Sequence, residues 1–173
     1  MANFLDPEEI LDQLKLKKDM VAAEFGSGSG GFTIALAKRL TDGLVYALDI
    51  QQPPLSALKS RSQIENVWNI RVIRCDLEKP RGSSLSDFSL DLVLVPNVLF
   101  QVEDKEAIIQ EAERILKKKG RLVVLDWWPK ASSGPEQRVS PEEVEKIAKE
   151  LDLKVKKEFE AGLYHYGLIF EKR

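Results

Sequence analysis

The chain has 173 residues, of which 43% are hydrophobic and 31% charged, and its 26 basic and 28 acidic residues give a net charge of −2. This composition predicts one folded domain and excludes both a disordered chain and a general attraction to nucleic acid. With one cysteine, one histidine, no bilayer-length apolar run and no signal-peptide pattern at the start, we expect a cytoplasmic domain without a disulfide, a structural metal or a membrane segment.

The first residues are typical of a helix start, with Asp6 as the N-cap and Pro7 in the first turn. Apolar residues at helical spacing follow them. We predict one domain over residues 1–173, in which residues 1–19 add a helix that covers the ligand site of a core over residues 20–173. A helix that only packs on this core is the alternative.

Residues 21–31, VAAEFGSGSGG, form a short apolar run and a glycine-rich turn, and the helical pattern FTIALAKRL comes next. A buried strand that turns through glycines into a helix is how α/β proteins hold a nucleotide-like ligand. Glycines permit the sharp turn and the close approach of a ligand. The helix directs its free N–H groups and the positive end of its dipole at that ligand.

The rest of the chain alternates strand and helix patterns and then ends in two strands. Further strands are predicted at 44–50, 70–75, 90–95 and 121–127, helices at 53–64, 104–117 and from 141 on, and closing strands at 154–159 and 166–170. We interpret Lys117-Lys118-Lys119-Gly120 as a helix C-terminus, where cations meet the negative end of the dipole. This order predicts an α/β fold, a doubly wound, seven-stranded, mostly parallel sheet with an antiparallel C-terminal strand.

In a doubly wound sheet, ligands bind beyond the carboxyl ends of the strands, where the strand order reverses. Polar residues stand at these places, with Glu24 ahead of the glycines, Asp49 after the second strand, Asp76 after the third and Asn97 after the fourth. A carboxylate in the place of Asp49 can accept hydrogen bonds from both hydroxyls of a ribose. A purely structural glycine turn would not explain carboxylates at three successive strand ends.

This pattern resembles the class I S-adenosylmethionine-dependent methyltransferases, which have a Rossmann-like fold, over nearly the whole chain. That family's first motif is an acidic residue, any residue and then Gly-x-Gly-x-Gly, which EFGSGSG matches from Glu24 to Gly30. The resemblance implies S-adenosylmethionine as cofactor and methyl transfer as activity. The cofactor-binding residues that it implies are Glu24, Gly26, Ser27, Gly28, Gly30, Asp49, Ile50, Asp76, Leu77 and Asn97.

The same resemblance gives these residues their expected roles. Glu24 would support the methionine end through the loop, and Asp49 would bind the ribose. Ile50 would pack on the adenine, while Asp76 and the backbone of Leu77 would contact its edge. Asn97 would border the methionine end and the methyl acceptor.

Within the family, DLVLVPNVLFQVED and LKKKGRLVVLDW are similar to the branch of ubiquinone- and menaquinone-type methyltransferases. Where that branch often has a histidine pair, this chain has Phe100-Gln101, so the expected general base is absent. Pro96-Asn97-Val98-Leu99 also differs from the Asn-Pro-Pro-aromatic motif of enzymes that methylate amino groups of bases. We expect a small-molecule acceptor, because that branch uses small molecules, with nucleic acid or protein as the alternative.

Candidate residues on the acceptor side are Asn97, Phe100, Trp128, Arg138 and His165. Trp128 follows the fifth strand and either lines an acceptor pocket or packs in the core. Arg138 either holds an anionic acceptor or is a solvated loop residue. His165 is either structural or a contact to substrate, and with a tyrosine it is the available base. Cys75 ends a buried strand and is interpreted as a core residue rather than a nucleophile.

Two other classes of function stay open. Gly26, Gly28 and Gly31 also satisfy Gly-x-Gly-x-x-Gly, which a nicotinamide-dependent oxidoreductase would use, although we see no substrate domain for one. A cofactor-binding protein without catalysis would be compatible with the missing base. Glu24, Asp76 and the antiparallel ending favour the methyltransferase.

Overall fold

The computed structural model describes residues 5–173. The strands are β1 (Val21–Phe25), β2 (Leu44–Asp49), β3 (Ile70–Arg74), β4 (Leu90–Pro96), β5 (Leu116–Trp127), β6 (Leu153–Glu160) and β7 (His165–Lys172). They form a seven-stranded sheet in the order β3-β2-β1-β4-β5-β7-β6. Strands β1 to β5 are parallel, and β7 runs antiparallel between β5 and β6. The predicted fold is confirmed, and the strand order reverses between β1 and β4, where such sheets bind ligands.

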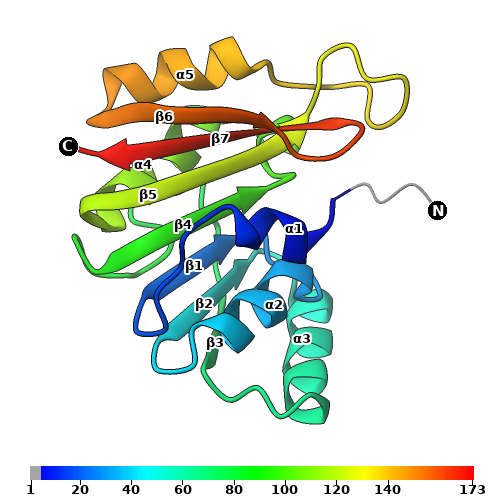
Figure 1. Ribbon diagram of the computed structural model, residues 1–173, viewed down its shortest axis with the longest axis vertical. Coiled ribbons are helices and arrows are strands. Elements are labelled where there is room, and N and C mark those ends of the chain that lie inside the picture. Colours follow the sequence, from blue (N-terminus) through cyan, green and yellow to red (C-terminus); the bar gives the residue numbers. More distant parts are fainter. Residues whose placement is uncertain (1–4) are drawn as a thin grey trace.

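Helices cover both faces of the sheet (Figure 1). One face packs against α1 (Pro7–Asp12), α2 (Gly31–Arg39) and α3 (Gln52–Ile64), and the other packs against α4 (Lys105–Ile115) and α5 (Pro141–Glu150). Strand β4 sends Leu92 and Leu94 to the first face and Val93 and Val95 to the second. Both faces of a central parallel strand are buried, so its sequence is apolar throughout.

Side-chain caps begin several of the helices, as the sequence predicts for α1. The Asp6 carboxylate accepts the N–H of Glu8 at 2.9 Å, and the Ser140 hydroxyl accepts the N–H of Glu143 at 3.2 Å. Each cap satisfies a backbone donor that the helix itself leaves unpaired, an interaction worth about 1 kcal/mol. Among the helices within residues 5–173, none is both long enough and apolar enough to cross a membrane.

The predicted end of the helix before β5 was wrong. Helix α4 ends at Ile115, and Lys117-Lys118-Lys119-Gly120 lie inside β5. Leu116 is fully buried and pairs with Leu90 of β4, so this pairing overrides the local preference for a longer helix. The register then shifts, and the lysines form an irregular segment with Lys119 at a φ of 62°. The closing strands β6 and β7 are also longer than predicted at both ends.

Helix α1 packs beside α2 on the first face of the sheet (Figure 1). The Arg39 guanidinium of α2 donates to the carboxylates of Glu8 at 2.5 Å and Asp12 at 2.7 Å. Ile10 and Leu11 are buried in the core of that face. The described part of the N-terminal segment is therefore anchored through both charge and apolar contact.

Candidate functional site

The turn between β1 and α2 requires glycine for both backbone and packing reasons. Gly26, Gly28 and Gly30 have φ values of 68°, 52° and 90°, in the left-handed region that side chains rarely adopt. A Cβ on Gly26 would also lie 2.6 Å from Cγ2 of Val98. The loop therefore runs close to the chain that follows β4 and leads directly into the amino end of α2.

Asp49 ends β2 and fastens this glycine loop. Its Oδ2 accepts the N–H of Gly28 at 2.9 Å, and its Oδ1 accepts the N–H of Gln51 at 2.9 Å. A carboxylate offers about four acceptor positions, so both oxygens can accept further hydrogen bonds from a ligand. Two adjacent hydroxyls, as on a ribose, match this geometry.

A cavity of about 440 Å³ lies where these strand ends meet the start of α3 and α4. The predicted cofactor residues that line it are Gly26, Gly28, Asp49, Ile50, Asp76 and Leu77. Glu78 adds another carboxylate, and the residues lining this described cavity include no lysine, arginine or histidine. The cavity therefore favours a ligand that combines an apolar ring with hydroxyl or cationic groups.

Of the remaining predicted cofactor residues, Glu24 is buried below the loop and does not line the cavity. Its carboxyl accepts a hydrogen bond from the Thr33 hydroxyl of α2. Burial raises the pKa of Glu24 to about 8, hydrogen bonds from Thr33 oppose this shift, and the charge of Asp49 adds to it. Ser27 and Gly30 are also buried and shape the loop from within, since the Gly30 N–H donates to the Ser27 carbonyl at 2.9 Å.

Sequence reasoning missed the rest of the cavity lining, part of which comes from η1 (Leu99–Gln101) and α4. Its further lining residues are Gln51, Pro54, Cys75, Glu78, Val98, Gln101, Val102 and Ile108. Glu78 joins the segment after β3 to the start of α4, because its Oε1 accepts the N–H groups of Glu103 at 2.9 Å and Asp104 at 2.7 Å. The signal that could have identified Glu78 was its position two residues after Asp76.

Cys75 lies half-buried in the lining of the same cavity. Burial raises the pKa of its thiol to about 11, and the charges of Glu111, Asp49 and Asp76 contribute to this shift. The thiol therefore stays protonated at neutral pH, where only a thiolate would be nucleophilic. Its place in the cavity lining, after a partly exposed strand, differs from the core position that the sequence predicted.

Asn97 and His165 meet beside the cavity. Asn97 follows β4 at a φ of 56°, and its Oδ1 lies 2.9 Å from Nε2 of His165, which is fully buried at the start of β7. The Asn97 amide and the His165 ring therefore share a hydrogen bond, whose direction is set by the tautomer of the ring. The His165 ring also packs against the ring of Trp127, with centroids 4.2 Å apart.

Phe100 lies in the short 3-10 helix η1 (Leu99–Gln101), and its side chain is partly exposed. Its backbone N–H donates to the Asp126 carboxylate at 3.3 Å. Asp126 is fully buried at the end of β5, and this burial raises its pKa to about 6. The carboxylate joins the segment after β4 to the end of β5, a role that sequence reasoning did not identify.

Arg138 has its guanidinium engaged within its own loop. It donates to the carbonyl oxygens of Pro135, Trp128, Pro129, Ala131 and Ser133 at 2.7 to 3.2 Å. An anionic acceptor would have to compete with these carbonyls.

Trp128 is partly exposed and lines a second cavity of about 750 Å³. The acceptor-side roles of Asn97, Phe100, Trp128, Arg138 and His165 stay predictions.

Comparison with known proteins identifies a family for this chain. Residues 16–165 match the family described as a methyltransferase domain. A demethylmenaquinone methyltransferase from Lactobacillus johnsonii is 27% identical over 124 residues, which cover 69% of this chain and 48% of that protein. The chain thus spans about half the length of this curated relative.

Solved structures show the same fold. A S-adenosylmethionine-dependent methyltransferase from Aquifex aeolicus superposes with a TM-score of 0.87 at 24% identity, covering 98% of this chain and 90% of that one. A geranyl diphosphate C-methyltransferase from Streptomyces coelicolor superposes with a TM-score of 0.78 at 15% identity, covering 96% of this chain and 79% of that one. The family match covers most of the chain and agrees with the strand order and the glycine loop. The chain therefore belongs to the methyltransferase-domain family and has the fold of the class I S-adenosylmethionine-dependent methyltransferases.

Proposed function

We propose that this protein transfers a methyl group from S-adenosylmethionine to a small molecule in the cytoplasm. The observation that carries this proposal is the acidic cavity in which Asp49 is bonded to the glycine loop. Membership in the family and the predicted binding motif support the same conclusion.

The residues of the cavity fit the parts of S-adenosylmethionine. Asp49 would hold the ribose hydroxyls, Ile50 and Leu77 offer apolar surface to the adenine, and Asp76 can accept from its amino group. The acidic lining favours a ligand whose sulfonium and ammonium groups are positive. Bound S-adenosylmethionine would supply an electrophilic methyl group, and the chain would supply binding and orientation.

The same observations speak against a nicotinamide-dependent oxidoreductase. A dinucleotide brings a doubly anionic pyrophosphate, which binds to unpaired backbone N–H groups at the start of a helix. Here the cavity is lined by the carboxylates of Asp49, Asp76 and Glu78, and its described lining residues include no lysine or arginine. This negative charge disfavours phosphate groups.

A small acceptor is favoured by the nature of the relatives. The matched proteins from Lactobacillus johnsonii and Streptomyces coelicolor are named for demethylmenaquinone and geranyl diphosphate, which are both small molecules. Methyl transfer requires no side-chain nucleophile, so the absence of a catalytic triad from the sequence is expected. Since the Nε2 of His165 is engaged with the Asn97 amide, His165 is better placed to orient that amide than to remove a proton through Nε2.

The proposal is tested by calorimetric titration with S-adenosylhomocysteine, the product form of the cofactor. We expect one site of micromolar strength that NADH does not compete for. A second assay uses S-adenosylmethionine labelled in its methyl group and a panel of small acceptors. Turnover excludes a binding protein without catalysis, and a folded protein that does not bind S-adenosylhomocysteine would overturn the proposal.

A further inference from the structure

The second cavity, of about 750 Å³, lies beyond the end of β5 and the start of β7. Its walls are the loop after β5, the start of α5 and the turn between β6 and β7. Apolar surface comes from Trp128, Pro129, Leu163 and Tyr164, and the Leu163 side chain is 71% exposed. Ligand sites typically measure about 300–1,000 Å³ and are mostly apolar with a few polar groups. The cavity matches them in both respects.

The walls of this cavity are fixed without a ligand. Arg138 fastens the loop through its donations to backbone carbonyls, Trp128 and Pro129 among them. The Trp128 N–H donates to the Tyr164 carbonyl at 2.9 Å, which joins the loop to the β6–β7 turn. The Trp128 ring also packs on Tyr166, with centroids 5.3 Å apart. A preformed cavity binds more tightly because little has to be ordered on binding.

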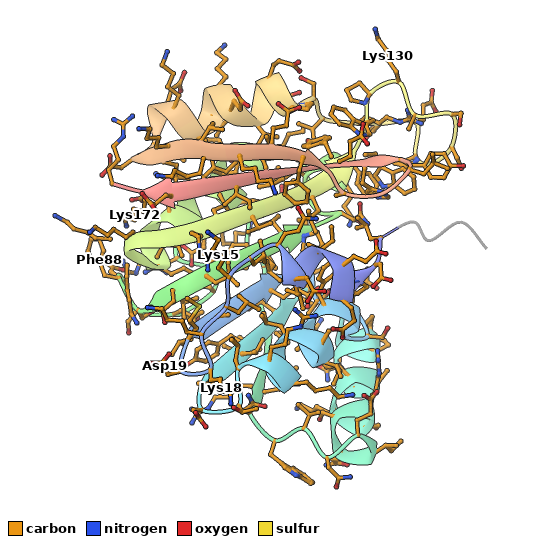
Figure 2. The ribbon with its side chains drawn as sticks, in the orientation of Figure 1. Lys15, Lys18, Asp19, Phe88, Lys130 and Lys172 are labelled. Carbon is orange, nitrogen blue, oxygen red and sulfur yellow. The ribbon has the colours of Figure 1, made fainter. Side chains whose placement is uncertain are left out.

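The charges around the cavity favour an uncharged ligand. Lys130, Glu142 and Glu160 contribute to the lining and are all exposed. Figure 2 shows Lys130 projecting from the loop away from the body of the protein. Because the carboxylates outnumber this lysine and the Arg138 donors point at carbonyls, the cavity offers no built site for an anion.

One side-chain contact connects the chain segments that line the two cavities. Val98 lines the cofactor cavity and packs against Gly26, while Tyr164 lines the second cavity. The residues next to them along the chain are Asn97 and His165, whose side chains are 2.9 Å apart. The contact between Asn97 and His165 therefore joins the segment that follows β4, which lines the cofactor cavity, to the β6–β7 turn, which lines the second cavity.

From this arrangement we propose that the second cavity binds the uncharged, ring-bearing part of the methyl acceptor, which stacks on Trp128 and Tyr164 and contacts Leu163. The proposal rests on the proposed function, since it identifies the acceptor class for that same reaction. It assigns Arg138 to the construction of the acceptor site rather than to contact with the acceptor.

The test uses 2-naphthol as an uncharged ring probe and 2-naphthalenesulfonate as its anionic counterpart. Binding of each is measured by calorimetry with and without saturating S-adenosylhomocysteine. We expect 2-naphthol to bind in both conditions, and the sulfonate to bind about tenfold more weakly. Competition between 2-naphthol and S-adenosylhomocysteine would overturn the proposal, because it would place the ring in the adenine site.

Matched variants locate the probe. Trp128→Leu and Leu163→Asp are expected to weaken 2-naphthol binding about tenfold and to leave S-adenosylhomocysteine binding unchanged. The exposed position of Leu163 protects its variant from unfolding. Two exposed side chains provide controls. These are Trp68→Leu after α3, at a side chain that is 72% exposed, and Ile64→Asp at the end of α3, at a side chain that is 79% exposed. These controls should change affinity by no more than about twofold.

The two proposals fail in different ways. If S-adenosylhomocysteine binds but 2-naphthol does not, or if the variants and the controls behave alike, the acceptor cavity is overturned and the methyltransferase stands. If S-adenosylhomocysteine does not bind the folded protein, the proposed function fails and the acceptor role of the cavity fails with it.

Discussion

The two cavities at the carboxyl ends of the strands are built on different physical principles. The first contains glycines in the left-handed conformation, and its backbone N–H groups and carboxylates make directed polar contacts. The second is lined by rings and by Leu163, and a loop held by Arg138 forms one of its sides. A cofactor of fixed structure suits the first kind of site, and an acceptor that varies among relatives suits the second.

This difference has an energetic consequence. Hydrogen bonds to a charged group contribute about 1.5–3 kcal/mol each, and their loss leaves a buried ligand group without a partner. An aromatic contact adds about 0.5–1.5 kcal/mol beyond the apolar area that it buries. Changes in the first cavity should therefore be more severe than changes in the second.

The largest effect is expected from Asp49→Ala. The variant loses the acceptor for the ribose hydroxyls and the hydrogen bond that fastens Gly28, so affinity for S-adenosylhomocysteine should fall about 100-fold or more. Calorimetry measures the change. Asp42→Ala, at an exposed carboxylate in the turn before β2, is the matched control. Affinity within about threefold of the parent would disprove the ribose assignment.

Glu24→Gln should alter how stability depends on pH. The pKa of this carboxyl rises from 4.5 to about 8 on folding. Between these values the folded state keeps a proton that the unfolded state has lost, so the contribution of Glu24 to stability is greatest below pH 4.5 and falls as pH rises toward 8. The parent's Tm should therefore fall by several degrees more than that of the glutamine variant from about pH 5 to about pH 8.

Thermal unfolding followed by circular dichroism at each pH measures this difference. Asp126, whose pKa burial raises to about 6, contributes with the same sign in both proteins and cancels in the comparison. Parallel curves of Tm against pH for the parent and Glu24→Gln would contradict the prediction.

The sequence predicted the first cavity better than the second, for a physical reason. The glycines, Asp49 and Asp76 come directly after strands that the apolar pattern identifies, so their position in the sequence predicts their position at the site. Asn97 and His165 are 68 residues apart, and nothing local to either indicates their contact. Within the first cavity, Glu78 was missed for the same reason, because it accepts from N–H groups 25 and 26 residues away.

The lysine segment at 117–119 shows how a correct local argument gives a wrong boundary. Cations do stabilise a helix C-terminus, but Leu116 gains more by burial beside Leu90 in the sheet. The strand therefore begins before the lysines. Arg138 is a similar case, because a sequence shows an arginine in a loop without showing the carbonyls that surround it.

Arg138→Met should have an intermediate effect and sharpen the contrast between the cavities. Loss of the donations to the loop carbonyls should lower Tm by about 5 °C and leave affinity for S-adenosylhomocysteine unchanged. Lys130→Met, at an exposed side chain of the same loop, is the control. Differential scanning fluorimetry gives Tm. An unchanged Tm together with loss of turnover on an anionic acceptor would instead support the acceptor-binding role that the sequence suggested.

The smallest effect is expected from Arg39→Ala, which tests whether residues 1–19 cover the site. The variant loses ion pairs to Glu8 and Asp12, whose side chains are 63% and 73% exposed. Exposed pairs contribute about 0–1 kcal/mol, so Tm should fall by less than about 3 °C. No residue of α1 lines the described cofactor cavity, so we expect affinity for S-adenosylhomocysteine to stay unchanged.

Calorimetry and hydrogen exchange over residues 5–16 distinguish the two roles of this helix. Arg61→Ala, which removes an exposed pair with Glu65 at the end of α3, is the matched control. Faster exchange with unchanged cofactor affinity would identify α1 as a packing helix, held mainly by the buried Ile10 and Leu11. If affinity falls several-fold in Arg39→Ala but not in Arg61→Ala, the helix closes over the cofactor. The segment before β1 would then belong to the first cavity, although its side chains do not line that cavity in the described structure.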